Sequence, residues 1–174
     1  MTNIVLIGFR GAGKTVIGRR LARRLKRRLI ETDELIIRVA GMSVKEIVER
    51  YGWRGFRELE SRVVEEVSRL DDCIVDTGGG VVLRRENIDN LKENGIVIWL
   101  KADAETVISR IRHDTERPSL TGNKSFVEEV EEVLNQRKKM YEDAADYSID
   151  TSKLKADKVV TRIIGYLKRK KILE

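Results

Sequence analysis

Short apolar runs alternate along the chain with stretches in which apolar residues return every three or four positions. The runs are residues 3–9, 29–35, 73–80, 96–101 and 147–151. Runs of this length, bounded by glycine or polar residues, are typical of buried strands, whereas the three-to-four spacing is typical of amphipathic helices. Strands that alternate with helices predict an α/β fold, in which a parallel sheet is covered by helices on both faces.

Helical spacing persists over five longer stretches. They are residues 14–28, 43–70, 102–113, 125–145 and 157–170. Gly52 and Gly55 should interrupt the helix that contains them, because glycine is a poor helix former. Within residues 29–35 we expect the edge of the second strand to run into an acidic loop. Residues 114–123 contain the only proline and are polar apart from Leu120, so we expect a mobile loop there.

The composition fits one cytoplasmic domain that spans residues 1–174. Hydrophobic residues make up 41% of the chain, which is enough for a core. No apolar run approaches the roughly 20 residues of a membrane span, and the N-terminal segment is too short for a signal peptide. The single cysteine, Cys73, and the single histidine, His113, exclude a disulfide framework and a His/Cys zinc site.

The net charge of +6 arises from 35 basic and 29 acidic residues. Much of the excess lies in residues 19–28 and 166–171, which we interpret as solvated helix faces. Only nine residues are aromatic, and no basic patch is rich in them, so a stacking surface for single strands is not expected. We predict a monomer that binds small molecules, without nucleic-acid or membrane partners.

Residues 8–15, GFRGAGKT, match the pattern G-x-x-x-x-G-K-[ST] between a predicted strand and a predicted helix. Glycines let backbone N–H groups surround a phosphate chain, and the start of the helix adds its positive end. A lysine here reaches the β- and γ-phosphates, and the hydroxyl that follows suits Mg²⁺. The pattern predicts a site for ATP and Mg²⁺ on Gly11, Ala12, Gly13, Lys14, Thr15 and Val16.

Three acids follow predicted strands: Glu31, Asp33 and Asp76. The carboxyl ends of parallel strands meet at one edge of a sheet, so these side chains should lie near the phosphates. Carboxylates beside a triphosphate are unfavourable unless a metal ion or an acceptor hydroxyl uses them. Salt bridges with nearby arginines are the alternative, and the residues alone leave it open.

Six segments together are similar to the shikimate kinase family. They are GFRGAGKT (8–15), ETD (31–33), GFRELE (55–60), DTGGG (76–80), ERPSL (116–120) and the arginine of NQRKKMY (135–141). The resemblance runs from about Ile4 to Thr151. It implies a three-layer P-loop fold with a five-stranded sheet in the order 2-3-1-4-5. It also implies a substrate-binding helical region at about 33–61 and a mobile lid at about 112–124.

The same resemblance implies a reaction, the ATP-dependent phosphorylation of the 3-hydroxyl of shikimate in aromatic amino-acid biosynthesis. Asp33 would bind the ring hydroxyls and accept the proton of the attacking hydroxyl. Arg57 and Arg137 would hold the carboxylate of shikimate, as suits the planar donors of arginine. Gly79 would contact the substrate through its backbone, and Glu60 would orient an arginine.

On the nucleotide side, the resemblance makes Arg117 the lid arginine that closes over the phosphates. With Lys14, it would stabilise the charge on the transferring phosphoryl group. Arg110 would lie against the adenine, which residues 150–157 would wrap. Thr15, Glu31 and Asp76 are the metal-binding candidates.

The chain departs from the family pattern at several positions. Glu31 stands where an aspartate that helps to hold Mg²⁺ is usual, and Asp76 stands where a small residue is usual. Our hypothesis is that Asp76 takes over part of the metal-organising role. Arg54 either alters acceptor affinity or pairs with an acid, Ser119 replaces a common leucine, and Trp53 either walls the acceptor pocket or merely packs.

Two alternatives to a shikimate kinase remain open from the sequence. The first is another small P-loop kinase, for gluconate or a nucleoside monophosphate. The second is a non-catalytic nucleotide-binding protein, which the basic helices alone would support.

Overall fold

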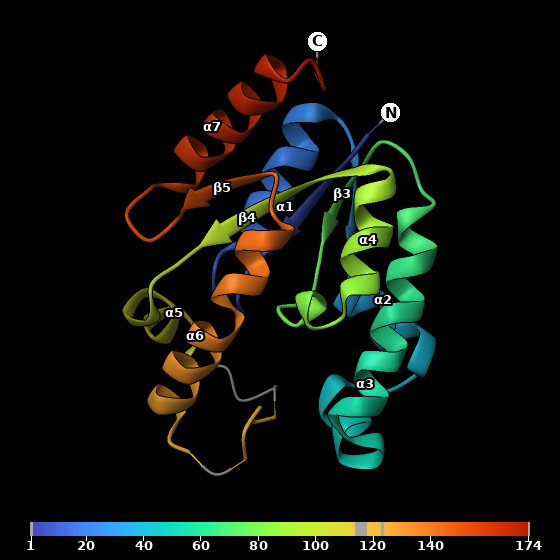
Figure 1. The fold of residues 1–174 in the computed structure, drawn as a ribbon, viewed down its shortest axis with the longest axis vertical. Coiled ribbons are helices and arrows are strands. Elements are labelled where there is room, and N and C mark those ends of the chain that lie inside the picture. Colours follow the sequence, from blue (N-terminus) through green and yellow to red (C-terminus); the bar gives the residue numbers. More distant parts are fainter. Residues whose placement is uncertain (1, 114–117, 123, 174) are drawn as a thin grey trace.

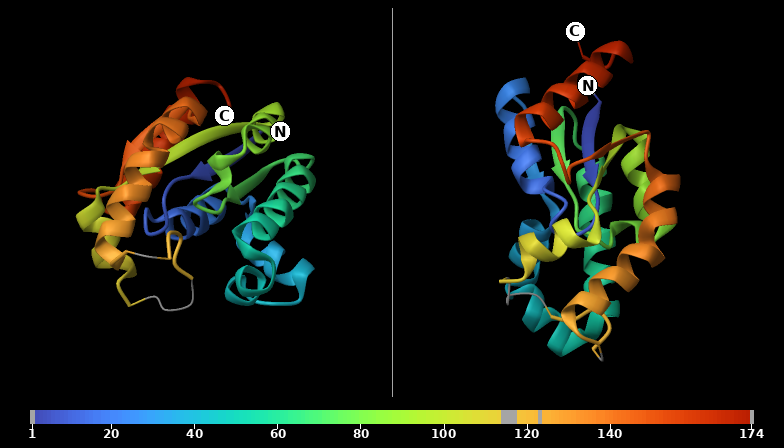
Figure 2. Two further views of the ribbon diagram at one scale, coloured as in Figure 1. Left: turned by 60° about the horizontal axis from the view of Figure 1, so that its bottom comes forward. Right: turned by 90° about the vertical axis from the view of Figure 1, so that its left-hand side faces the viewer.

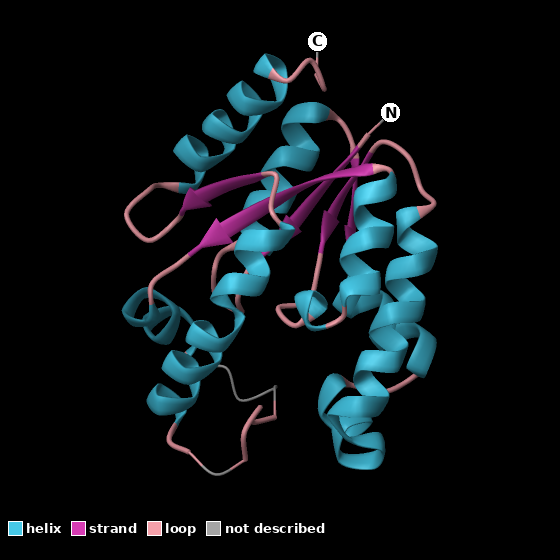
Figure 3. Cartoon of the chain, in the orientation of Figure 1, coloured by secondary structure: helices cyan, strands magenta, loops and turns pink. Residues whose placement is uncertain are grey.

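A computed structural model describes residues 2–113, 118–122 and 124–173. Its centre is a sheet of five parallel strands, in the order β2-β3-β1-β4-β5 (Figure 3). The strands are β1 (Asn3–Ile7), β2 (Arg28–Glu31), β3 (Cys73–Asp76), β4 (Gly95–Lys101) and β5 (Tyr147–Asp150). The order implied by the family resemblance and all five predicted strands are therefore confirmed.

Helices cover both faces of the sheet (Figure 1). They are α1 (Lys14–Leu25), α2 (Thr32–Ala40), α3 (Val44–Ser68), α4 (Arg85–Glu93), α5 (Ala104–Ile111), α6 (Phe126–Ala144) and α7 (Ala156–Arg169), with a short 3₁₀ turn at Val81–Leu83. In the central strand β1, Ile4 and Leu6 pack with α1 and α7, whereas Val5 and Ile7 pack with α2, α3, α4 and α6. Alternate side chains of a strand point to opposite faces, and the three layers follow from this alternation (Figure 2).

Two parts of the secondary structure differ from the sequence-based prediction. The acidic loop expected after β2 is wrong, because α2 begins at Thr32 and carries Asp33 and Glu34 in its first turn. Acidic side chains are favourable there, since they face the positive end of the helix dipole. Helix α4 was not predicted, and Asn87, Ile88 and Leu91 are its only buried residues among those described.

The interruption predicted at Gly55 is wrong, because that residue stays helical within α3, but the one predicted at Gly52 is confirmed. Its backbone has φ 67° and ψ 176° inside α3, a conformation that glycine adopts at little cost. The predicted mobile loop at 114–123 falls partly outside the described residues, which include only 118–122 of it. Helix α6, which follows, starts with a capping box between Ser125 and Glu128, and this fixes where its first turn begins.

Candidate active site

The loop between β1 and α1 has the geometry of a phosphate-binding loop. Gly8, Gly11 and Gly13 have φ values of 147°, 81° and 94°, which residues with a side chain rarely adopt. The ammonium group of Lys14 lies inside the turn and donates to the carbonyl oxygens of Gly8 and Phe9, at 2.8 and 3.1 Å. The loop therefore combines a turn that needs glycine with a nearly buried cation at the start of a helix.

A cavity of about 370 Å³ opens beside this loop. The predicted nucleotide-binding and metal-binding residues that line it are Gly11, Gly13, Lys14, Thr15, Val16, Glu31 and Asp76, and Asp33, the predicted catalytic acid, lines it with them. Ala12 is fully buried instead, and its carbonyl accepts a hydrogen bond from the hydroxyl of Thr151 at 2.9 Å. The acids that follow β2 and β3 thus meet the loop at one edge of the sheet, as predicted.

Arg110 joins the loop to the segment that follows β5. Its guanidinium donates to the carbonyl of Gly11 at 2.9 Å and to the carbonyl of Thr151 at 3.0 Å. These bonds hold residues 11 and 151 together across the end of the sheet. The predicted contact of Arg110 with adenine stays a prediction.

The two acids predicted to bind the metal occupy different environments. Glu31 and Asp76 are paired neighbours on β2 and β3. Asp76 is 6% exposed and accepts a hydrogen bond from the hydroxyl of Thr15 at 2.6 Å, whereas Glu31 forms an ion pair with Arg19 at 3.1 Å. Burial raises the pKa of Asp76, and Lys14 opposes that effect.

Among the described residues, no three His, Cys, Asp or Glu side chains form a metal-binding group. Mg²⁺ beside a nucleotide keeps several waters and takes one or two carboxylates together with phosphate oxygens. The hydroxyl of Thr15 and a carboxylate within hydrogen-bond distance of it are all-oxygen donors of that kind. The residues present therefore fit Mg²⁺.

A second cavity lies next to the first and holds the residues predicted to bind the acceptor. The predicted ones that line it are Asp33, Arg57, Gly79 and Arg137. Asp33 and Gly79 line both cavities, so the two cavities meet at these residues. Helix α2 is tied to the turn after β3 because Gly78 N–H donates to the Thr32 hydroxyl at 3.2 Å, and this bond helps to fix Asp33 at the junction.

Arg57 and Glu60, one turn apart on α3, form an ion pair inside the second cavity wall. The Arg57 Nη1–Glu60 Oε2 distance is 2.7 Å, and the two side chains are 12% and 0% exposed. The pair also explains the glycines of the turn. A Cβ on Gly80 would lie 2.2 Å from Cζ of Arg57, and a Cβ on Gly78 would lie 2.7 Å from Oε1 of Glu60.

Arg137 approaches the same turn from α6. Its Nη1 donates to the carbonyl of Gly79 at 3.2 Å, and the hydroxyl of the buried Tyr141 donates to that carbonyl as well. Burial lowers the pKa of Arg137, and the charge of Arg57 lowers it further. Two largely buried guanidinium groups thus lie close to the buried carboxylate of Glu60, and paired guanidinium groups of this kind suit an anionic ligand.

Four further residues complete the comparison between the predicted site and the structure. Arg117 lies outside the described residues. Arg10, within the glycine-rich loop, lines both cavities, and only its place in the motif could have indicated this. Trp53 lines the second cavity and also packs edge-on against Phe56, so the two alternatives are not exclusive. Arg54 is mostly exposed and pairs with Glu58 at 3.4 Å.

Comparisons with known proteins agree with this geometry. A model of the shikimate kinase family matches residues 10–168. A shikimate kinase of Pelotomaculum thermopropionicum is 41% identical over 100% of both chains. Another, from Caldanaerobacter subterraneus subsp. tengcongensis, is 42% identical over 98% of this chain and 99% of its own.

The solved structures give the same result. A shikimate kinase from Acinetobacter baumannii, in complex with shikimate, superposes with a TM-score of 0.93 and 32% identity, over 99% of this chain and 96% of that one. The two chains therefore share one fold over nearly their whole length. The chain belongs to the shikimate kinase family.

Proposed function

We propose that the protein transfers the γ-phosphoryl group of ATP to the 3-hydroxyl of shikimate, which yields shikimate 3-phosphate and ADP. The observation that carries the proposal is the pair of adjoining cavities, one beside the phosphate-binding loop and the other lined by Arg57 and Arg137, with Asp33 in the wall of both. A triphosphate in the first and a small carboxylate in the second would bring their reacting groups together at Asp33.

The acceptor side needs an anion site at one end and a hydrogen-bond acceptor at the other. Arg57 and Arg137 supply the first, because guanidinium groups bind carboxylates through two parallel hydrogen bonds. Glu60 is a positioning residue, since its carboxylate holds Arg57 at 2.7 Å. Asp33 orients the acceptor hydroxyl and takes its proton, although in phosphoryl transfer positioning is the larger effect.

The nucleotide side supplies charge to the phosphates. Residues 11–16 bind the phosphate chain through backbone N–H groups, and Lys14 binds the phosphate oxygens. We assign Mg²⁺ to Thr15 with Asp76 and Glu31 nearby; when bound, it neutralises charge on the β- and γ-phosphates. Arg117 as the lid arginine and Arg110 as the adenine contact complete the proposal.

An assay of ADP release tests the acceptor and the role of Asp33 together. Purified protein with MgATP is given shikimate, gluconate, AMP or no acceptor. We expect ADP release with shikimate alone, and a fall of about 10²- to 10⁴-fold in kcat for Asp33→Asn, the range of a general base. Asp89→Asn is the matched control, because Asp89 is an exposed acid on α4 that pairs only with Arg85 among the partners described.

Release of ADP with another acceptor, or without any, would contradict the proposal. Turnover with gluconate or AMP would indicate one of the related small-molecule kinases instead. ATP binding without any turnover would indicate a non-catalytic nucleotide-binding protein.

The proposal includes shikimate and ATP as the partners of the protein, and it does not extend to the cellular location. None of the helices in the described part of the chain is long and apolar enough to cross a membrane. Location in the cytoplasm, a monomeric state and the lack of a nucleic-acid partner stay predictions.

A further inference from the structure

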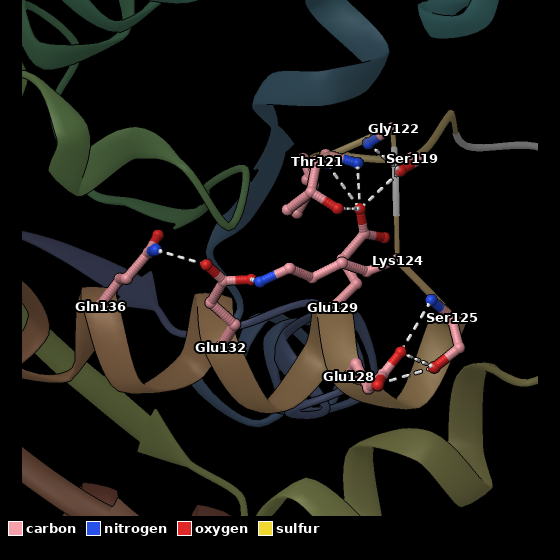
Figure 4. A network of polar contacts seen from close by, with 10 residues as sticks. Ser119, Thr121, Gly122, Lys124, Ser125, Glu128, Glu129, Glu132 and Gln136 are labelled. Atoms are coloured by element: carbon pink, nitrogen blue, oxygen red, sulfur yellow. Dashed lines mark hydrogen bonds and ion pairs between the residues drawn. The ribbon is translucent and has the colours of Figure 1, made fainter.

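Glu129, in the first turn of α6, collects four hydrogen bonds from a segment that precedes the helix. Its Oε1 atom accepts from the Ser119 hydroxyl at 2.6 Å, from the backbone N–H groups of Leu120 and Thr121 at 2.6 Å each, and from the Thr121 hydroxyl at 2.9 Å. Figure 4 shows these donors converging on one carboxylate oxygen. Residues 119–121 are thereby tied to α6 through a single side chain.

The neighbouring acids of α6 show that this arrangement is specific to Glu129. Glu128 is exposed and caps the helix at Ser125, and Glu132 pairs with Lys124. Glu129 is 9% exposed. Burial alone would raise its pKa, but the hydrogen bonds from Ser119, Thr121 and Leu120 together lower it. A buried charge that is satisfied by backbone and hydroxyl donors is costly to disturb.

The segment that Glu129 holds is part of the acceptor cavity. Pro118, Leu120 and Glu129 itself line that cavity, together with Arg57 and Arg137. The position of Glu129 therefore decides where one wall of the acceptor site lies.

The same segment reaches the opposite side of the cavity through Ser119. Its carbonyl oxygen accepts a hydrogen bond from Nε1 of Trp53 at 3.0 Å. Trp53 follows the interruption of α3 at Gly52, and Cζ of Arg57 lies 5.4 Å from the centre of its ring. A chain of direct contacts thus runs from Glu129 through Ser119 and Trp53 to Arg57.

We propose that Glu129 is a positioning residue for the phosphoryl transfer described above. Its carboxylate fixes residues 119–121 as a wall of the acceptor cavity and, through the Ser119–Trp53 bond, supports the side of Arg57. The inference rests on the proposed function, since it assigns Glu129 to the same acceptor site. It also gives Ser119 a role, because its hydroxyl and its carbonyl make the two ends of the connection.

Loss of the Glu129 carboxylate should weaken the binding of the acceptor more than the binding of ATP. A wall that moves by about 1 Å can lower the efficiency of a positioned reaction by roughly a hundredfold. Within the described part of the chain, the hydrogen bonds of Glu129 go to residues 119–121 and none goes to the phosphate-binding loop. Water should also enter more readily, and an active site that excludes water less well hydrolyses more ATP without an acceptor.

The test compares Glu129→Gln and Glu129→Ala with Glu128→Gln. The control removes the same charge from the adjacent residue, and glutamine still forms a capping box. For Glu129→Gln we expect the KM for shikimate to rise roughly ten- to a hundredfold, with the KM for ATP within about twofold of the unsubstituted protein. Glu129→Ala should go further in the same direction, and ATP hydrolysis without acceptor should increase in both.

Hydrogen exchange gives a readout that does not depend on turnover. The amides of Leu120 and Thr121 should exchange more slowly in the unsubstituted protein and in Glu128→Gln than in Glu129→Gln. Trp53→Phe keeps an aromatic ring but removes the donor to Ser119, so it should raise the KM for shikimate. Combined with Glu129→Gln, it should add less than its effect alone, because both changes release the same segment.

The outcomes separate the two proposals. A Glu129→Gln protein with lower thermal stability but an unchanged KM for shikimate would reduce Glu129 to a purely structural role and overturn the inference. Unchanged exchange at Leu120 and Thr121 would overturn it as well. Failure of the unsubstituted protein to phosphorylate shikimate would instead contradict the proposed function.

Discussion

Substitution of Gly80 by alanine should move Arg57 without unfolding the protein. A Cβ at position 80 would lie 2.2 Å from Cζ and from Nη2 of Arg57, and 2.3 Å from its Nη1. All three atoms belong to the end of a flexible side chain rather than to backbone. The least costly response is therefore for the guanidinium to leave its place against the turn.

The size of the effect follows from the distances. Unstrained contacts between heavy atoms begin near 3.5 Å, so the guanidinium must move by about 1.3 Å or more. Such a shift breaks the 2.7 Å bond to Glu60 and misaligns the donors that bind the carboxylate of the acceptor. Hydrogen bonds to charged groups contribute about 1.5–3 kcal/mol each, which corresponds to roughly a ten- to a hundredfold rise in the KM for shikimate.

The assay is steady-state ADP release over a range of shikimate concentrations, with thermal unfolding measured in parallel. Gly165→Ala is the control: a Cβ there would make an ordinary contact, 3.5 Å from Arg169, on α7 and away from both cavities. Loss of the Arg57–Glu60 pair should lower the free energy of unfolding by about 1–3 kcal/mol. A folded Gly80→Ala protein with a KM within about threefold of the unsubstituted value would refute the reasoning.

Two further predictions concern charge. Asp76→Ser should raise the Mg²⁺ concentration needed for half-maximal activity more than Glu31→Asp does, because Asp76 bonds to the Thr15 hydroxyl; equal Mg²⁺ dependence in Asp76→Ser and the unsubstituted protein would contradict this. The pKa of Glu129 is lowered in the folded state. The charge of Glu129 therefore stabilises the fold at any pH above its unfolded-state pKa, which is about 4.3. This stabilisation is lost as the pH falls through the lower pKa of the folded state. The difference in unfolding free energy between the unsubstituted protein and Glu129→Gln, measured by denaturant titration, should therefore shrink below about pH 4; a difference that does not change with pH would count against it.

Strands β1 and β3 could be predicted because burial on both faces leaves a clear signal in the sequence. In β1 and β3 every residue is buried, and a strand of this kind is a continuous apolar run. Helices α2 and α4 were harder to predict from the sequence, each for its own reason. The start of α2 follows β2 without a turn and is acidic, which resembles a loop. In α4, charged and polar residues outnumber the apolar ones, so its apolar face is narrow.

The candidate site also has one part that could be predicted from the sequence and one part that could not. The phosphate-binding loop is contiguous, so its residues and their chemistry could be predicted together. The acceptor site is built from α2, α3, α6 and the turn after β3, and only the family resemblance connected these segments before the structure did. Glu129 had no such signal. It is one of several acids in a helix whose other acids are exposed or half-buried, and its burial depends on a tertiary contact with residues 119–121.

The choice between Glu31 and Asp76 shows why spacing alone could not assign the metal site. Both acids end neighbouring strands at the same level of the sheet, so topology predicts that each lies near the phosphates. The two acids differ in the side chain with which each interacts. Glu31 forms an ion pair with Arg19, on the exposed side of α1, at 3.1 Å. Asp76 accepts a hydrogen bond from the hydroxyl of Thr15, at the start of the same helix, at 2.6 Å. An exposed ion pair contributes little and can open, so Glu31 remains able to approach a bound ion. Asp76 needs no such rearrangement, because the hydroxyl that suits Mg²⁺ is already its hydrogen-bond partner.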